Sequence, residues 1–341
     1  MSGRRGIKVF GIIVLILVII LVLIVGSIFF FVNSKLSKIQ QVNIDESDLG
    51  VSSQVEENLS EYRNIALFGI DSRDSSLGKG NRSDCIIIAS INNKTKEVKL
   101  ISVYRDTYVN IEGYGLDKIT HAYSYGEASL ALKTLNENFD LNITEFVTVN
   151  FDAVAEAVNA LGGITINVEP EEVDYINQYI NETSEVTGLD TEKVTTSGSQ
   201  TLDGVQAVAY ARIRYTEGGD YKRTERMRTV VEAMVNKFKT KSISEMNQII
   251  DQILPEVYTN ITAGDIFSLL PSVASFNVTD SIGWPYETKG ITLDRWYGVP
   301  VTLESNVKQL HEEAFGETDY MPSDKVKEIS NQIIEKTGYT N

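Results

Sequence analysis

The stretch FVTVNFDAVAEAVNALGGITINV, residues 146–168, carries the pattern of a strand, a helix and a second strand. The apolar run Phe146–Phe151 is typical of a buried strand, and the closing ITINV has the alternation of another. Between them, Asp152–Leu161 places its apolar side chains on one helical face, and a Gly-Gly pair ends the helix. That face consists of Val154, Ala155, Val158 and Leu161. The stretch therefore predicts a helix packed on a sheet.

Alternating strand and helix signals continue on both sides of this stretch. Apolar, strand-like runs lie at Ile65–Ile70, Cys85–Ile91 and Val98–Val103, and a late strand is expected in RWYGVPVTL at 295–303. The polar segment 92–96 predicts an antiparallel hairpin. Helices are expected at Ala122–Phe139, Thr201–Tyr210, Thr224–Lys239, Asp265–Ala274 and Ser305–Ala314. Residues 173–199 are polar and poorly periodic, which indicates a surface excursion. The sequence predicts an α/β fold.

The amino-terminal part predicts a membrane anchor. Residues 9–32 contain no charged side chain and are long enough as a helix to cross a hydrocarbon core of about 30 Å. A cleaved signal peptide is the alternative, but its apolar region is shorter and ends at small residues, whereas this run ends in Phe-Phe-Phe-Val. Arg4, Arg5 and Lys8 favour a cytoplasmic amino terminus, and Lys35 and Lys38 on the other side weaken that bias.

We therefore expect five parts along the chain. They are a short cytoplasmic tail at 1–8, a transmembrane helix at 9–32, a polar stalk at 33–61, a folded domain at 62–315 and a polar carboxy-terminal tail at 316–341.

The charge balance disfavours nucleic acid as a partner. Residues 1–38 hold five of the 31 Lys and Arg and none of the 47 acidic residues, so the remainder carries a net charge of −21. Such a domain repels phosphate backbones. The lone Cys85 excludes an internal disulfide and is expected to be a buried, inert thiol.

Acidic residues stand at the ends of two apolar runs. Asp71 directly follows IALFGI and Asp84 directly precedes CIIIAS, with Arg73 and Arg82 beside them. Strand ends are where α/β folds place sites, and two such carboxylates could hold Mg²⁺ together with a phosphate-bearing partner. Simple pairing of these carboxylates with the neighbouring arginines remains an open alternative.

Other charged residues follow the third run. Arg105 and Asp106 stand at its end, where a surface ion pair would explain them, and Lys118 precedes a helix. His121 is expected to be a structural hydrogen-bonding residue, and His311 is expected to be exposed and uninvolved.

The densest signal is the basic segment 212–228 in an otherwise acidic domain. At about 100° per residue, Arg223, Arg226, Met227 and Val230 share one helical side, and Arg228 points elsewhere. An arginine on an apolar face must find an anion, and guanidinium groups match phosphate oxygens. We therefore expect Arg212, Arg214 and Arg223 to bind phosphate, with Asp220 either capping the helix or ordering the arginines.

Six blocks of sequence lie in order over about residues 64–230. They are LFGIDSR, RSDCIIIASI, LISVYRDTYV, DKITHAYSYG, VNFDAVAEAVNALGGITINV and the pair LDGVQAVAYARIRY and GGDYKRTERMR. In combination they resemble the LytR-CpsA-Psr family of cell-envelope phosphotransferases. The sequence departs from the family pattern at Met227, Thr120 and Glu127, where Gln, Asn and Gly are more usual.

The resemblance implies a three-layer α-β-α domain with a mixed central sheet and an apolar cavity for a polyprenyl chain. It implies transfer of a glycopolymer, such as teichoic acid or capsule, from undecaprenyl pyrophosphate to peptidoglycan, by a domain held outside the cell membrane on a single-pass anchor. The implied catalytic residues are Asp71, Asp84, Arg105 and Asp220, and the first two would hold Mg²⁺ or Mn²⁺. Pyrophosphate would be bound by Arg82, Arg105, Arg212, Arg214 and Arg223, with Arg73, Asp106 and Lys118 as further candidates.

Two other functions fit the same residues. A hydrolase would use the same arginines to cleave polyprenyl pyrophosphate with water. A non-catalytic lipid-binding regulator, in keeping with the family's older label of transcriptional attenuator, would bind the lipid without turnover.

Overall fold

The computed structural model describes residues 40–70, 77–279 and 281–340. The expected membrane span at 9–32 and the candidate residues Asp71 and Arg73 lie outside these ranges. Within them, none of the helices combines the length and the apolar character that crossing a membrane requires.

A mixed sheet forms the centre of the domain. Its strands, in spatial order, are β1 (Gln40–Gln41), β10 (Tyr258–Thr259), β7 (Glu145–Val149), β2 (Tyr62–Ile70), β3 (Ser83–Asn92), β4 (Glu97–Val103) and β11 (Asn277–Val278), and β12 (Ile282–Trp284) also pairs with β4. β2 runs parallel to β7 and antiparallel to β3, and β3 forms the expected antiparallel hairpin with β4. The predicted α/β class and hairpin are confirmed.

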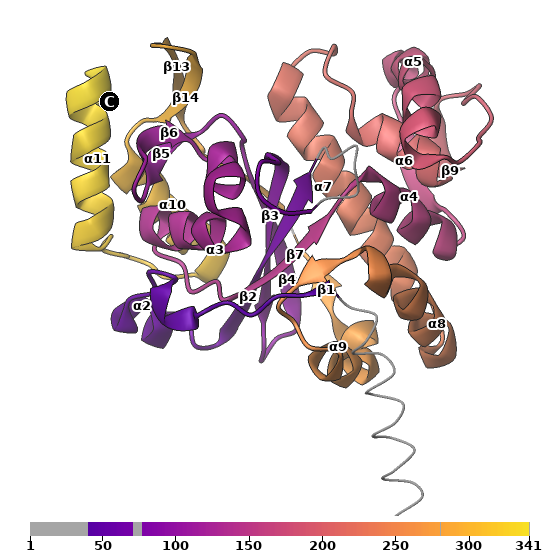
Figure 1. Ribbon diagram of the computed structural model, residues 1–341, viewed down its shortest axis with the longest axis horizontal. Coiled ribbons are helices and arrows are strands. Elements are labelled where there is room, and N and C mark those ends of the chain that lie inside the picture. Colours follow the sequence, from indigo (N-terminus) through magenta and orange to yellow (C-terminus); the bar gives the residue numbers. More distant parts are fainter. Residues whose placement is uncertain (1–39, 71–76, 280, 341) are drawn as a thin grey trace, which may run out of the picture.

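Helices cover both faces of this sheet, which gives three layers (Figure 1). Along β3, Ile86 and Ile88 enter the core shared with α3 (Thr120–Phe139), α10 (Leu303–Phe315) and α11 (Asp324–Thr337), whereas Ile87 and Ala89 face the other side. Because successive strand residues point to opposite faces, a continuous apolar strand is what a sheet buried on both sides requires.

The second helical layer begins with α4, the helix of the stretch that predicted the fold. α4 (Phe151–Ala160), α5 (Pro170–Thr187), α6 (Gly204–Ala211) and α7 (Gly219–Phe238) lie on the face opposite α3 (Figure 1). β8 (Ile164–Val168) follows α4 and pairs with β9 (Gly198–Leu202), beyond α5, in a separate two-stranded antiparallel sheet. The helix ends where Gly162 and Gly163 adopt positive φ.

The remaining elements are short or lie at the rim. They are α2 (Ser53–Asn58), β5 (Tyr108–Ile111), β6 (Gly115–Lys118), α8 (Ile243–Ile253), α9 (Ala263–Leu269), β13 (Thr288–Thr292), β14 (Trp296–Pro300) and the 3-10 turns η1 (Glu46–Asp48), η2 (Leu254–Glu256) and η3 (Leu270–Ser275).

The structure corrects three expectations about segments that are polar overall. Residues 173–199 are not a mere surface excursion, because α5 runs to Thr187 and buries Ile176 and Ile180. The expected stalk is partly folded, since Leu49 and Leu59 are fully buried in the core. Each segment has few apolar residues among many polar ones, yet those few are enough to fix it on the core.

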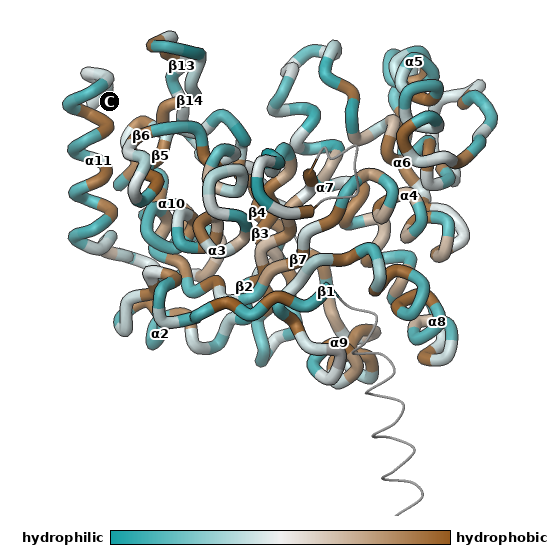
Figure 2. The backbone as a smooth tube through the Cα atoms, viewed as in Figure 1, coloured by the Kyte–Doolittle hydropathy of each residue, from teal (hydrophilic) through white to brown (hydrophobic). Residues whose placement is uncertain are grey.

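The expected carboxy-terminal tail is also wrong, because α11 packs against α10 and the rest of the core. Its apolar residues Val326, Ile329 and Ile333 recur among polar ones, as Figure 2 shows along the helix, and all three are buried. His311 is buried rather than exposed: Nε2 lies 3.0 Å from the carbonyl oxygen of Phe139. The turn before α11 thus closes over a histidine that sequence reasoning placed in solvent.

Replacing Ser323 with alanine is expected to lower the free energy of unfolding by about 1–2 kcal/mol. Ser323 caps α11, where its Oγ accepts a hydrogen bond from the Val326 amide, and it donates to Asp140 at 2.6 Å. The measurement is denaturant unfolding followed by tryptophan fluorescence. Ser60→Ala, at an exposed serine bonded only to a local carbonyl, should be neutral. Equal stability of Ser323→Ala and the parent would contradict the docked helix.

Candidate active site

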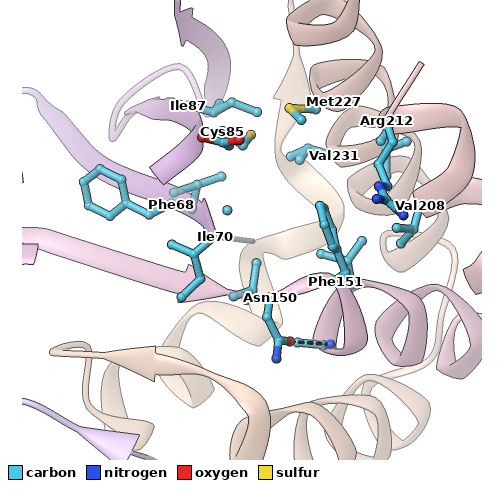
Figure 3. A pocket seen from close by; sticks show the side chains of 18 of the residues that line it. Phe68, Ile70, Cys85, Ile87, Asn150, Phe151, Val208, Arg212, Met227 and Val231 are labelled. Atoms are coloured by element: carbon cyan, nitrogen blue, oxygen red, sulfur yellow. Dashed lines mark hydrogen bonds between the residues drawn. The ribbon is translucent and has the colours of Figure 1, made fainter. Parts of the chain in front are cut away.

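An apolar cavity of about 450 Å³ separates the sheet from the second helical layer. β2, β3 and β7 form one wall and α4, α6 and α7 form the other, as the close-up in Figure 3 shows for Ile87 and Cys85 opposite Met227 and Val231. The wall of the sheet includes Leu67, Gly69, Cys85, Ile87, Val147 and Val149; that of the helices includes Val154, Ala157, Val208, Met227, Val231 and Met234. Such a lining suits a long hydrocarbon ligand.

Cys85 belongs to the lining of this cavity and not to a reactive centre. Burial, with a smaller effect of the neighbouring Asp84, raises the pKa of its thiol to about 12. The partial exposure of the side chain is toward the cavity that it lines. The thiol therefore stays protonated at neutral pH, as expected for an inert cysteine.

Charged residues gather where β3 begins and α6 ends, at one end of the cavity. Asp84, Arg212, Arg214 and Arg223 line the cavity together with its apolar residues. We call these four, with Arg105, Asp106, Lys118 and Asp220, the charged cluster. An apolar cavity that ends in arginines can take an amphiphile with an anionic head.

Arg212 is held by α5 and by two aromatic rings. Its guanidinium lies 3.0 Å from both Glu182 Oε1 and Thr183 Oγ1. The same group stands over the rings of Phe151 and Tyr179, at 5.0 and 5.4 Å from their centroids. These contacts fix the planar guanidinium at the wall of the cavity.

Asp84 connects two arginines from different segments. Arg105 Nη1 donates to Asp84 Oδ2 at 2.8 Å, and Arg214 Nη2 lies 3.7 Å from the same oxygen. Asp106 continues the chain of charges, with Oδ1 3.7 Å from Arg105 Nε and 2.7 Å from Lys118 Nζ. The carboxylates thus hold three cations close to one another.

Arg223 is a buried cation with two nitrogens that are not used in hydrogen bonds. Its side chain is only 3% exposed, and Nη2 lies 2.7 Å from Asp220 Oδ1. That contact is not aligned as a hydrogen bond, so Nε and Nη2 both lack a hydrogen-bond acceptor among the described residues. Because a buried donor without an acceptor is costly, these two nitrogens point to a bound anion.

Two glycines place Arg223 and Asp220 at the start of α7. Gly218 and Gly219 have φ of +88° and +52°, a left-handed conformation that glycine adopts without strain. Burial raises the pKa of Asp220, and Arg105 is the largest of the opposing influences. Asp106 and Asp84 add to the increase, which means that the three carboxylates belong to one electrostatic neighbourhood.

Arg226 was expected on the same helical side as Arg223, and the structure confirms this. Its role differs, because all of its bonds go to the protein: Nε to Glu172 Oε1 at 2.7 Å, Nη1 to the carbonyl of Ile213, and Nη2 to Thr216 Oγ1. Arg226 therefore positions the loop that carries Arg212 and Arg214.

The candidate residues are brought together to different degrees. Asp84, Arg105, Asp106, Lys118 and Arg214 form the connected ion pairs described above, with Arg212, Arg223 and Asp220 nearby. Arg82 is exposed just before β3 and makes no ion pair within the described part of the chain. His121 bonds to Asp117 at 2.9 Å, as a structural histidine would.

Sequence reasoning missed the residues that surround Arg212. Tyr179, Glu182 and Thr183 belong to the segment that was expected to be irregular. The three- and four-residue spacing of Ile176, Tyr179, Ile180 and Thr183 is the signal that could have revealed α5. Met227 stands where the family more usually has Gln, and its side chain lines the cavity and adds to its apolar surface.

The fold and the site define a three-layer α/β protein with an apolar cavity that ends in a cluster of arginines. The LytR_cpsA_psr family model matches residues 27–309, and the chain belongs to this family.

Curated relatives match much of the chain. The sequence is 34% identical, over 77% of this chain and 82% of the relative, to the polyisoprenyl-teichoic acid–peptidoglycan teichoic acid transferase TagU of Enterococcus faecalis. It is also 34% identical to TagT of Bacillus subtilis, which bears the same transferase description, over 67% of this chain and 70% of the relative.

Solved structures are similar as well. One, described as TagT bound to LIIa-WTA, is 27% identical, with a TM-score of 0.57 over 82% of this chain and 92% of that one. Another, described as the family protein YwtF (TagT) with bound octaprenyl pyrophosphate lipid, is 25% identical, with a TM-score of 0.54 over 88% and 97% of the two chains.

Proposed function

We propose that this protein transfers a teichoic acid or a similar glycopolymer from a polyprenyl pyrophosphate carrier to peptidoglycan. The observation that carries the proposal is an apolar cavity whose charged end includes Arg223, with two buried nitrogens that lack hydrogen-bond acceptors. The names of the relatives support it, because they describe this transfer, and the structure with octaprenyl pyrophosphate has the same fold.

The donor would bind with its hydrocarbon chain in the cavity and its phosphates at the charged cluster. Burial of an apolar chain contributes about 25 cal/mol per Å², so the cavity supplies affinity without regard to the glycan. Arg212, Arg214 and Arg223 would hold the phosphoryl oxygens, since guanidinium groups donate paired hydrogen bonds to them.

The reaction would be a displacement at the phosphorus nearest the glycan. A sugar hydroxyl of the wall forms a new phosphorus–oxygen bond, the bond to the bridging oxygen breaks, polyprenyl phosphate leaves, and the hydroxyl proton is released. Negative charge grows on the departing phosphate, and fixed cations such as Arg105 and Arg223 stabilise it most when they are already positioned.

The donor set suits a magnesium ion, and Mn²⁺ would fit the same ligands. Both arginine contacts of Asp84 go to Oδ2, and Oδ1 takes part in no ion pair among the described residues. No group of three potential ligands gathers in the described ranges, but Mg²⁺ often needs only one or two carboxylates beside substrate phosphates. Asp84 would hold it with Asp71, which lies outside the described residues; when bound, the ion would neutralise phosphate charge.

The localisation follows from the substrates. A carrier lipid stays in the bilayer and peptidoglycan lies outside it, so we propose that residues 9–32 anchor the chain with its amino terminus in the cytoplasm and the domain outside. The central sheet already includes Gln40 and Gln41 of β1, which leaves a shorter tether than the sequence indicated. A short tether keeps the site near the membrane surface.

The test is transfer by the full chain in detergent, with a lipid-linked glycopolymer as donor and peptidoglycan as acceptor. Asp84→Asn is expected to lower the transfer rate at least about tenfold, because it removes a carboxylate charge between Arg105 and Arg214. Chelation should abolish transfer, and added Mg²⁺ should restore it. Asp48→Asn changes an exposed carboxylate that pairs with Lys133 of α3, outside the charged cluster, and serves as the control.

Each alternative predicts a different result of this assay. Release of the carrier phosphate without any attached glycan would identify a hydrolase. Tight lipid binding with no turnover for any donor would favour a lipid-binding regulator and reject the transferase. Full activity in the presence of chelator would reject the metal requirement and leave the transferase function standing.

A further inference from the structure

A second recess lies against the side of α7 that faces away from the lipid cavity. Its volume is about 200 Å³, and its lining shares no residue with that of the larger cavity. The lining consists of Tyr104, Gly218, Tyr221, Lys222, Glu225, Arg228 and Gly283. At about 100° per residue, Tyr221, Glu225 and Arg228 share a helical side roughly opposite to Arg223.

The recess is next to the charged cluster along two segments of the chain. Tyr104 directly precedes Arg105, and Tyr221 directly follows Asp220. The recess and the phosphate-binding arginines are therefore neighbours that lie on different sides of the first turns of α7.

Two tyrosines form the aromatic part of the recess. The rings of Tyr104 and Tyr221 meet edge to face, with centroids 4.4 Å apart and planes at 83°. Tyr221 is 40% exposed, so it presents a ring to solvent. Gly283 makes room for this arrangement, because a Cβ at that position would lie 2.3 Å from the hydroxyl of Tyr104.

The rim of the recess carries both signs of charge. Lys222 Nζ bonds to Glu225 Oε1 at 2.9 Å, and Arg228 Nη1 donates to the carbonyl of Ile282 at 2.9 Å. A purely apolar ligand would desolvate these groups without compensation, and a strongly anionic one would meet Glu225. A sugar ring fits both the aromatic part and the charged rim of the recess. Its C–H face packs on an aromatic ring, and its hydroxyl groups offer hydrogen-bond donors and acceptors to the rim.

We propose that this recess binds a sugar ring of the peptidoglycan acceptor, and the proposal rests on the transferase function above. In a displacement at phosphorus, the attacking oxygen and the leaving oxygen lie roughly in line on opposite sides. The leaving carrier occupies the lipid cavity, so the acceptor has to approach from another side of the charged cluster. The recess lies on such a side, and it shares no lining residue with the lipid cavity.

The first test is direct binding of a soluble peptidoglycan glycan fragment to the full chain in detergent, by calorimetry. Tyr221→Ala is expected to weaken binding at least tenfold, whereas Tyr221→Phe keeps the ring and should stay within twofold. Tyr114→Ala is the matched control, because Tyr114 is another exposed tyrosine, stacked on Tyr125 and outside the recess. Absence of binding to the parent protein, or equal binding by Tyr221→Ala, overturns the proposal.

The second test separates the acceptor from the donor glycan. In the transfer assay, Tyr221→Ala should raise the KM for acceptor at least tenfold and leave the Kd for lipid-linked donor within twofold. Weaker donor binding with an unchanged acceptor KM would assign the recess to the donor and overturn our assignment. Tyr221-dependent fragment binding without any transfer would instead support the recess and reject the transferase function.

Discussion

Replacing Arg223 with alanine is expected to lower the rate of glycopolymer transfer by roughly 100- to 1,000-fold. The guanidinium is almost fully buried, and its Nε and Nη2 have no hydrogen-bond acceptor among the described residues. In the proposed complex these nitrogens meet phosphate oxygens, where a fixed cation acts most strongly on the charge that grows during transfer. The measurements are kcat/KM for transfer and the Kd of the lipid-linked donor.

Two further variants make this expectation specific. Arg223→Lys keeps the charge but loses the planar pair of donors, so it should recover only part of the rate. Arg295→Ala removes an exposed arginine that pairs with its neighbour Asp294, and it should behave as the parent. If Arg223→Ala stays folded by thermal unfolding and keeps at least a third of the parental rate, phosphate binding by this residue is refuted.

The sequence predicted those parts of the fold that local patterns determine. β3 and β4 were visible as two apolar runs joined by a polar turn, and the structure pairs them as expected. α4 was predictable because the spacing of its apolar residues indicates a helix and the glycines that follow indicate where it ends. In these segments the period of the hydrophobic residues and the turn residues indicate the same secondary structure, so a single sequence is enough to predict it.

Segments held by a few distant contacts were not predictable in this way. α11 is polar along most of its surface and is fixed by three apolar side chains and by Asp140, which accepts hydrogen bonds from Tyr320 and Ser323. His311 is buried because the same part of the chain folds back over it, with its ring stacked on Tyr320. Such contacts join residues far apart in sequence, and periodicity contains no information about them.

The site was predictable to the extent that helical geometry determines it. The angles placed Arg223 and Arg226 on one buried side and Arg228 on another, and the structure agrees. They did not distinguish the roles of the first two, because the acceptors of Arg226 come from Glu172, Ile213 and Thr216 in other parts of the chain. Which buried arginine retains unused donors is decided by tertiary structure.

The assignment of Arg226 to a positioning role leads to the second large effect. Glu172→Ala is expected to lower the free energy of unfolding by about 3–5 kcal/mol, because it leaves a guanidinium that is 1% exposed without its carboxylate. Denaturant unfolding can be followed by the fluorescence of the buried Trp284. Donor affinity should fall as well, because the loop with Arg212 and Arg214 loses a fixed partner.

A double-variant cycle separates this ion pair from simple loss of packing. Glu172→Met combined with Arg226→Met should be less destabilising than the sum of the two single changes, because it leaves neither charge buried alone. Glu61→Ala breaks the exposed pair with Lys94 and should cost at most about 1 kcal/mol. Additive effects of the two buried changes would show that Glu172 and Arg226 contribute independently. Donor affinity then separates the two functions of the pair: a double variant that regains stability but not affinity assigns Arg226 to the placement of the phosphate-binding loop.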